Sequence, residues 1–220
     1  MRIHDHLLLL PPFQGMSRND IETVVAHTRF AFSKYDKGKV VVGEGEKCDH
    51  LCFLLQGELT ATESADDGSY SIEETVKAPA MIQPERIFGM EQRYTKTFTA
   101  AAECGVVSID KKDTTRLMSE FEIFRLNILN ILCTKTQRLS RYQWRKTPET
   151  IRLKIFGFME KRCMTPAGHK RLKIKMEVLG ALLGESRINV SKCIKTLQDK
   201  GLVTHSRAIM DIHALEKLKE

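Results

Sequence analysis

Long apolar runs are missing from this 220-residue sequence. No stretch approaches the ~20 consecutive apolar residues that a helix needs to cross a bilayer. The apolar run at residues 7–10 is too short for the hydrophobic part of a signal peptide, and Asp5 precedes it. We therefore expect no membrane span, no targeting segment and a cytoplasmic protein.

The common catalytic signatures are missing as well. The sequence contains no G-x-S-x-G, no G-x-G-x-x-G, no phosphate-binding P-loop, no H-E-x-x-H and no C-x-x-C. Each of these spacings brings particular reactive or ligand-binding groups together, so their absence removes the usual sequence evidence for catalysis. We expect that the chain is not an enzyme, and we predict neither catalytic residues nor a metal site.

Cysteines are few and scattered. The six lie at positions 48, 52, 104, 133, 163 and 193, and only Cys48 and Cys52 are close in sequence. Such spacing predicts reduced thiols that act mostly as small buried apolar groups. A redox pair between Cys48 and Cys52 would require their side chains to converge in the fold.

Charge is divided unevenly along the chain. Residues 145–220 hold 17 Lys and Arg against 8 Asp and Glu, a net charge of +9, whereas residues 1–144 hold 18 against 20, a net charge of −2. A basic half favours a polyanionic partner because neutralising phosphates releases their condensed counterions. A merely solvated basic surface is the alternative on charge alone. Hydrophobic residues make up 42% of the chain, enough to bury a core and to form two domains.

The N-terminal half alternates like a β structure. A helical lead-in to about residue 28, with Ser17 as its N-cap, precedes short segments of strand-like alternation separated by glycine and aspartate turns. We predict strands at 30–35, 40–42, 51–55, 58–64, 70–76, 81–83, 98–102 and 106–109. The fold class is α+β, and residues 1–113 should form a β-roll or jelly-roll barrel.

Past residue 113 the period becomes helical. We predict one long helix over 114–144, whose apolar residues form a heptad seam suited to a dimer. The seam comprises Leu117, Phe121, Phe124, Ile128 and Ile131. A second apolar stripe, at Leu126, Leu129, Leu132 and Leu139, suggests that the helix packs both on its own barrel and on a partner. A core helix packed only within the chain is the alternative.

A hinge at residues 144–147 should begin the C-terminal domain, 145–220. We expect Thr147 to cap a helix that starts at Pro148, followed by a strand at 170–175. Residues 176–203 then predict two short helices joined by a turn at Gly184, the second capped by Ser186 and ended by Gly201. Segments 202–205 and 208–212 complete a winged helix-turn-helix.

The second of these helices is expected to enter the major groove of DNA. Ile188, Val190, Ile194 and Leu197 are assigned to its buried side. Arginine and lysine match guanine, asparagine matches adenine, and serine matches a base or a phosphate. The predicted DNA-binding residues are Ser186, Arg187, Ile188, Asn189, Ser191, Lys192, Lys195 and, at the tip of the wing, Arg207. An ordinary solvated basic helix face is the alternative.

Three parts of the chain carry a family resemblance: residues 37–73, KGKVVVGEGEKCDHLCFLLQGELTATESADDGSYSIE; the long helix from about 114 to 143; and residues 179–203, LGALLGESRINVSKCIKTLQDKGLV. They are similar to the barrel signature, the dimer helix and the helix-turn-helix, in that order, of the CRP/FNR family of bacterial transcription regulators. The resemblance implies a homodimer on a two-fold symmetric site. It also places Arg187, Ile188 and Lys192 at base-reading positions. Ile188 departs from the glutamate common there, so the half-site sequence does not carry over.

The sensor half departs further from the family. Its cyclic-nucleotide-binding members hold ribose with a Gly-Glu pair and phosphate with an Arg-Ser pair; here Met90 follows Gly89, Glu91 comes one place late, and no Arg-Ser appears. Arg93 and Lys96 could still attract an anion. The tract that would meet an effector comprises Gly89, Met90, Glu91, Arg93, Lys96 and Thr97.

These departures leave the effector unidentified. They do not favour cyclic AMP, and residues 1–47 contain no cysteine for the iron–sulfur cluster of the family's other branch. Haem or another small molecule is still a candidate effector, although the seven histidines form no recognisable pair that would bind haem. We expect double-stranded DNA, a second copy of the chain and RNA polymerase as partners, with no membrane. A ligand-binding or scaffolding module without sequence-specific DNA binding is the alternative function.

Overall fold

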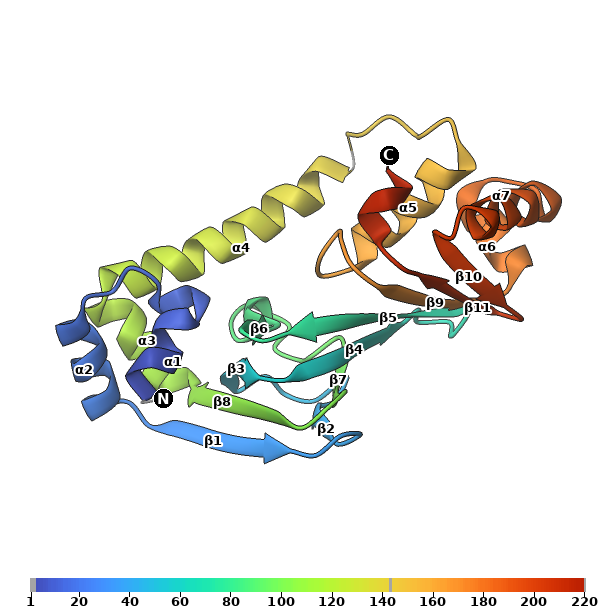
Figure 1. Cartoon of the computed structure of the whole chain (residues 1–220). Helices are drawn as coiled ribbons and strands as arrows, with labels where there is room; N and C mark the ends of the chain where they lie inside the picture. The colour runs from blue at the N-terminus through green and yellow to red at the C-terminus, as the bar shows by residue number, and fades with distance from the viewer. Residues whose placement is uncertain (1–2, 143, 220) are drawn as a thin grey trace. The chain divides into compact units, whose positions relative to one another are not determined.

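The computed structural model describes residues 3–142 and 144–219, and the chain divides into two compact units (Figure 1). The first unit comprises residues 1–60 and 76–140, and the second comprises 61–75 and 141–220. Within the described ranges, no helix combines the length and apolar character needed to cross a bilayer. The sequence pattern predicted a boundary at 144–147, but it did not predict that residues 61–75 join the second unit.

The first unit begins with short helices. They are α1 (Ile3–Leu9), η1 (Pro11–Phe13) and α2 (Arg18–His27). Ser17 caps α2 as predicted: the Asp20 backbone N–H donates to Ser17 Oγ at 3.1 Å, while the Ser17 N–H donates to the Asp20 carboxylate at 3.3 Å. This reciprocal pair satisfies two donors that would otherwise lack partners at the helix start.

Eight strands follow, each within two residues of its predicted bounds. They are β1 (Phe30–Tyr35), β2 (Val40–Val42), β3 (His50–Gln56), β4 (Glu58–Ser64), β5 (Tyr70–Lys77), β6 (Ala80–Ile82), β7 (Thr97–Ala100) and β8 (Cys104–Asp110), with η2 (Pro84–Arg86) between β6 and β7. One antiparallel sheet has the order β1-β8-β3-β6, and β2 pairs with β7. Phe53, Phe98 and Val107 are fully buried in the core of the first unit. The jelly-roll-like barrel predicted from the alternation is confirmed.

The helical segment after the barrel is broken, contrary to the prediction of one helix over 114–144. It consists of α3 (Lys111–Glu120) and α4 (Glu122–Tyr142). Phe121, between them, adopts an extended backbone with φ −116° and ψ 105°. The break contains neither glycine nor proline, so the local sequence carried no signal for it.

The predicted seam faces the chain's own core. Leu117 and Phe124 are fully buried, Ile128 is nearly so, and the Phe124 ring lies 5.0 Å from that of Phe13. Phe121 and Ile131 are half-buried. Leu117, Phe124 and Ile128 are buried within the chain and offer no surface to a second copy, which corrects their assignment to the dimer interface. Phe121 and Ile131 keep part of their surface exposed, so their assignment stays a prediction. Apolar spacing reveals that a helix has a buried stripe, but not which neighbour buries it.

The second unit contains the helix-turn-helix. Its elements are α5 (Ile151–Arg162), β9 (Lys170–Ile174), α6 (Met176–Leu183), α7 (Arg187–Asp199), β10 (Val203–Ser206), β11 (Ile209–Ile212) and η3 (Leu215–Leu218). The start of α5 corrects a prediction: Thr150 caps it, accepting from the Leu153 N–H at 3.3 Å, and Thr147 and Pro148 precede the helix. Either threonine could serve as a cap by residue type.

Residues 70–74 of β5 extend the sheet of the second unit. The antiparallel order is β10-β11-β9, and β9 pairs on its other edge with β5, from Tyr70 opposite Ile174 to Glu74 opposite Lys170. The Lys170 ammonium lies 3.0 Å from the Glu74 carboxylate, and both side chains are 1% exposed. Glu74 also accepts from the Met164 N–H at 2.7 Å. This buried ion pair had no counterpart in the sequence reading.

Candidate nucleic-acid interface

Helices α6 and α7 follow one another in the second unit (Figure 1). The turn between them depends on two glycines and a cap. Gly184 ends α6 in the left-handed conformation, with φ +66°, and Ser186 caps α7 by accepting from the Asn189 N–H at 3.2 Å. A Cβ on Gly180 would lie 2.8 Å from the Glu185 carbonyl oxygen, so only glycine permits this close approach. The predicted helix-turn-helix and both of its caps at this turn are confirmed.

The buried side of α7 is narrower than predicted. Val190, Ile194 and Leu197 are each no more than 2% exposed and join the core of the unit. Ile188, which the sequence reading also assigned to this side, is instead 66% exposed. Two residues advance a helix by about 200°, so Ile188 lies nearly opposite Val190. This correction places an apolar side chain on the outer face.

The outer face of α7 carries the other predicted DNA-binding residues. All are classed as exposed: Ser186, Arg187, Asn189, Ser191, Lys192 and Lys195. Arg187, Lys192 and Lys195 make this face positive, and the N–H groups of the first turn lie at the N-terminal end of α7; both features attract anions. The exposed face therefore has the charge and the donors to meet a nucleic acid, while the role of each residue stays a prediction.

The wing is a tight hairpin between β10 and β11. Ser206 pairs with Ile209, and Arg207 occupies the connecting turn with a positive φ of 54°. Its side chain is exposed. The structure thus puts Arg207 at the tip, where the sequence predicted a contact to the DNA backbone.

Glu177 on α6 belongs beside this surface, although the sequence reading did not include it. Its carboxylate lies 3.0 Å from Nε of Arg187, and both side chains are more than 60% exposed. An exposed pair of this kind contributes only about 0–1 kcal/mol. Arg187 can therefore exchange Glu177 for a phosphate or a base at small cost. This contact depends on the angle between α6 and α7, which the local sequence does not encode, so no sequence pattern could have predicted it.

The predicted effector tract of the barrel is used largely for internal contacts. The Arg93 guanidinium donates to the Gly45 carbonyl oxygen at 2.7 Å, and the Thr97 hydroxyl accepts from the Glu44 N–H at 3.1 Å. Both side chains hold the loop after β2. Each of these two side chains therefore has a partner within the barrel.

The remaining members of that tract have contrasting surroundings. Met90 is fully exposed, Lys96 is buried, and Glu91 forms a long ion pair of 3.7 Å with Arg86. The Gly89 carbonyl oxygen accepts from a nearby glutamine side chain. The six predicted positions are therefore divided among separate contacts and environments.

Two buried thiols converge inside the barrel. Sγ of Cys48 lies 3.7 Å, and Sγ of Cys52 3.8 Å, from the same carbonyl oxygen, that of His50, and the Cys52 sulfur is 3.6 Å from the Tyr94 hydroxyl. Burial raises the pKa of Cys48 and raises that of Cys52 to about 11. Both are therefore protonated at neutral pH, a state of low nucleophilicity. Among the described residues, no group of three His, Cys, Asp or Glu side chains is arranged to hold a metal ion.

Two family models match most of the chain. The model of the cyclic nucleotide-binding domain matches residues 32–121, and that of the Crp-like helix-turn-helix domain matches residues 153–220. The first match covers the barrel and α3, and the second covers nearly all of α5 and the elements that follow it. Their order along the chain is the order predicted from the change in hydrophobic period.

The chain is also similar to individual proteins. The chain is 24% identical over 182 residues to the cAMP-activated global transcriptional regulator Vfr of Pseudomonas aeruginosa, covering 77% of this chain and 83% of the relative. The catabolite activator protein of Thermus thermophilus is 16% identical, with a TM-score of 0.50 over 96% of this chain and 97% of that one. A transcriptional regulator of Thermotoga maritima is 19% identical, with a TM-score of 0.49 over 57% of this chain and 95% of that one. The Thermus structure supports the fold alone.

Proposed function

Because the chain belongs to the CRP/FNR family of transcription regulators, we propose that it binds double-stranded DNA sequence-specifically through α7 as a homodimer under control of its barrel. The observation that carries this proposal is the outer face of α7. Its polar and basic side chains project away from a fully buried apolar row, and the wing adds Arg207. The net charge of +9 on residues 145–220 supports it independently.

The outer face suggests a division of roles. Arg187 and Lys192 suit guanine O6 and N7, and Asn189 suits the N6 and N7 edge of adenine. Exposed Ile188 can contact only an apolar group, such as the thymine methyl. Ser186, Ser191, Lys195 and Arg207 are assigned chiefly to phosphates, which fix the register without reading sequence.

Selection from a pool of randomised duplexes with the purified full chain tests this function. We expect an enriched site with two-fold symmetry and half-sites about 34 Å apart, one turn of DNA. Its affinity should fall by about 0.9 log units per log unit of salt for each phosphate neutralised. Failure to enrich any sequence, with salt-insensitive binding, would instead favour the ligand-binding or scaffolding module.

The dimer is proposed to form along the exposed face of α4. Ile123, Leu126 and Leu129, at spacings of three, are each about 40–50% exposed, and exposed Cys133 continues the row. Partly exposed aliphatic side chains in a row are typical of a helix that packs on a partner. Leu126 and Leu129 also belong to the second apolar stripe predicted from the sequence. The exposed row replaces the buried seam as the proposed interface.

Sedimentation of two matched variants tests the dimer. Leu126→Asp should yield folded monomers, because a carboxylate cannot be buried unpaired between two helices. Leu139→Asp is the control: Leu139 is similarly exposed but lies about 140° from Leu126 around the helix, so the dimer should persist. A dimer unchanged by Leu126→Asp would rule out this interface.

The signal received by the barrel is proposed to be something other than cyclic AMP. The relative from Pseudomonas is named as cAMP-activated, but here Arg93 and Thr97 are engaged with Gly45 and Glu44. Calorimetry with cyclic AMP should therefore show no heat of binding, and saturable binding would contradict the proposal. Absorption and native mass spectra would reveal haem or another small molecule that copurifies. RNA polymerase is the proposed partner of the DNA-bound dimer.

A further inference from the structure

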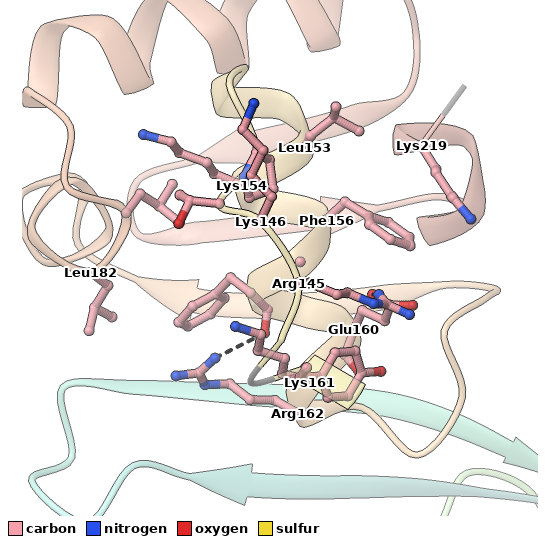
Figure 2. Close-up of a pocket in the computed structure, with 16 residues that line it drawn as sticks. Arg145, Lys146, Leu153, Lys154, Phe156, Glu160, Lys161, Arg162, Leu182 and Lys219 are labelled. Carbon is pink, nitrogen blue, oxygen red and sulfur yellow. Dashed lines mark hydrogen bonds and ion pairs between the residues drawn. The ribbon is translucent and has the colours of Figure 1, made fainter. Parts of the chain in front are cut away.

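A cavity of about 400 Å³ lies within the second unit (Figure 2). The segment preceding α5, α5 itself and the end of α6 contribute its walls. Its apolar lining consists of Leu153, Phe156, Phe158, Leu182 and Leu183. A volume of this size and an aromatic and aliphatic lining are typical of pockets for small organic molecules. Leu182 is also 46% exposed, so part of this apolar surface has no cover within the chain.

Gly157 leaves open space on the α5 side of the cavity. It lies in the middle of α5 and lines the cavity, and a Cβ added there would meet no atom within 4 Å. Glycine is a poor helix former, and a glycine inside a helix usually has a packing or functional reason. Close packing and a positive φ are both excluded as the reason here. The space in front of Gly157 is therefore large enough to accept a Cβ, and only a large side chain would fill it.

The charge around the cavity is strongly positive. Six basic residues line it, against the single carboxylate of Glu160: Arg145, Lys146, Lys154, Lys161, Arg162 and Lys219. Glu160 already accepts from Arg145 at 2.6 Å, while Lys154 is paired with Glu185 and Lys146 with Glu149, two carboxylates outside the lining. Lys161 and Lys219 have no acidic partner among the residues that the structure describes. An apolar interior with surplus positive charge at its rim complements an amphipathic anion.

We propose that this cavity binds a small organic anion with an apolar body, such as an aromatic or short aliphatic carboxylate. Its occupant would touch both the segment that precedes α5 and Leu182 and Leu183, which lie next to the Gly184 turn of the helix-turn-helix. Occupancy should therefore change how α7 is presented to DNA. This second statement rests on the proposed function, whereas binding itself does not.

Two fluorescent probes test the binding. The probe 8-anilinonaphthalene-1-sulfonate carries a sulfonate on an aromatic body, and N-phenyl-1-naphthylamine is a similar molecule without charge. We expect the sulfonate to bind the full chain at one site. Gly157→Phe should fill the cavity and weaken both probes at least tenfold, whereas Gly157→Ala, the matched control, should change either affinity by less than twofold and should not lower the melting temperature.

The charge requirement is tested with the double variant Lys161→Glu/Lys219→Glu. It should weaken the sulfonate at least fivefold and the uncharged probe less than twofold. These exposed positions can be changed without disturbing the core, so this test stands even if Gly157→Phe does not fold. Absence of saturable binding, wild-type affinity in Gly157→Phe, or an equal effect on both probes in the lysine variant would overturn the site.

The coupling to DNA is measured separately. Saturating sulfonate probe should change the affinity of the wild-type chain for its selected duplex at least threefold, and have no effect on Gly157→Phe. If the probe binds but DNA affinity does not change, the coupling is wrong and the site stands. If the wild-type chain selects no duplex, the proposed function fails while the probe titrations still decide the site.

Discussion

The outer face of α7 and the tract around Arg93 contain similar side chains in different situations. On α7, helical periodicity buries Val190 and Ile194 and leaves Lys192 in solvent. In the barrel, Arg93 donates to a loop carbonyl 48 residues away in sequence. Basic side chains are therefore available for binding in the first region and serve the fold in the second. Residue type alone does not separate these two uses, and the following predictions test the difference.

The largest effect should come from removing the buried ammonium with Lys170→Met. Because it leaves the Glu74 carboxylate buried without its countercharge, we expect the second unit to lose about 3–5 kcal/mol of stability. Hydrogen exchange should show the loss in peptides of residues 145–220, while β1 and β8 of the barrel keep their protection. The double variant Glu74→Leu/Lys170→Met is the control and should recover most of the stability. Equal loss in both units would show that they unfold together.

On the outer face of α7, Lys192→Ala should cost about 1–3 kcal/mol of binding free energy at the selected site and relax preference at one base pair. Anisotropy titrations against single-base variants of the duplex would measure it. Lys200→Ala, an exposed lysine at the other end of α7, is the control and should lower affinity equally for all sequences or not at all. A uniform loss in Lys192→Ala would make that residue a phosphate contact.

In the barrel, Arg93→Ala should cost about 0.5–1.5 kcal/mol of stability, because it removes the hydrogen bond to Gly45. DNA affinity should stay within twofold of wild type. Urea unfolding and duplex titration on the same preparation would measure both quantities. A loss of DNA affinity with stability unchanged would mean that Arg93 acts on the output rather than on the fold.

The smallest effect concerns the buried thiol of Cys52, whose pKa is raised by burial from an ordinary value near 9 to about 11. At neutral pH, alkylation of Cys52 in the folded chain should be about a hundredfold slower than in urea, since two pKa units correspond to a hundredfold less thiolate. The stability that this protonated thiol contributes is present below pH 9 and is lost as pH rises through 11. Rapid native labelling at pH 7, followed by mass spectrometry, would contradict this account of the barrel interior.

Much of the candidate DNA-binding site of the protein could be predicted because it is built from local sequence patterns. Ser186 is a cap by residue type, Gly184 is a turn by backbone freedom, and the row from Val190 to Leu197 follows the helical period. Ile188 shows the limit of that reasoning. Its apolar character suggested burial, whereas the angle from Val190 around the helix places it outside.

The remaining features depended on contacts between distant segments. Gly180 tolerates no Cβ because the carbonyl oxygen of Glu185, in the turn before α7, approaches it, and Arg187 contacts Glu177 only through the angle between α6 and α7. Which stripe of α4 is buried was decided by Phe13, more than a hundred residues earlier. Residues 70–74 likewise lie between barrel strands in the sequence, but they pair with β9 of the second unit.

By itself, the sequence determined the β-roll, the winged helix-turn-helix and the concentration of positive charge in the C-terminal part. Each of these follows from residue periodicity, caps and composition within a short window. Only the tertiary structure decided that Lys170 is buried beside Glu74, that Arg93 supports a loop and that Gly157 lines a cavity. Burial and pairing depend on which distant atoms approach a side chain, and no local pattern of residues specifies that approach.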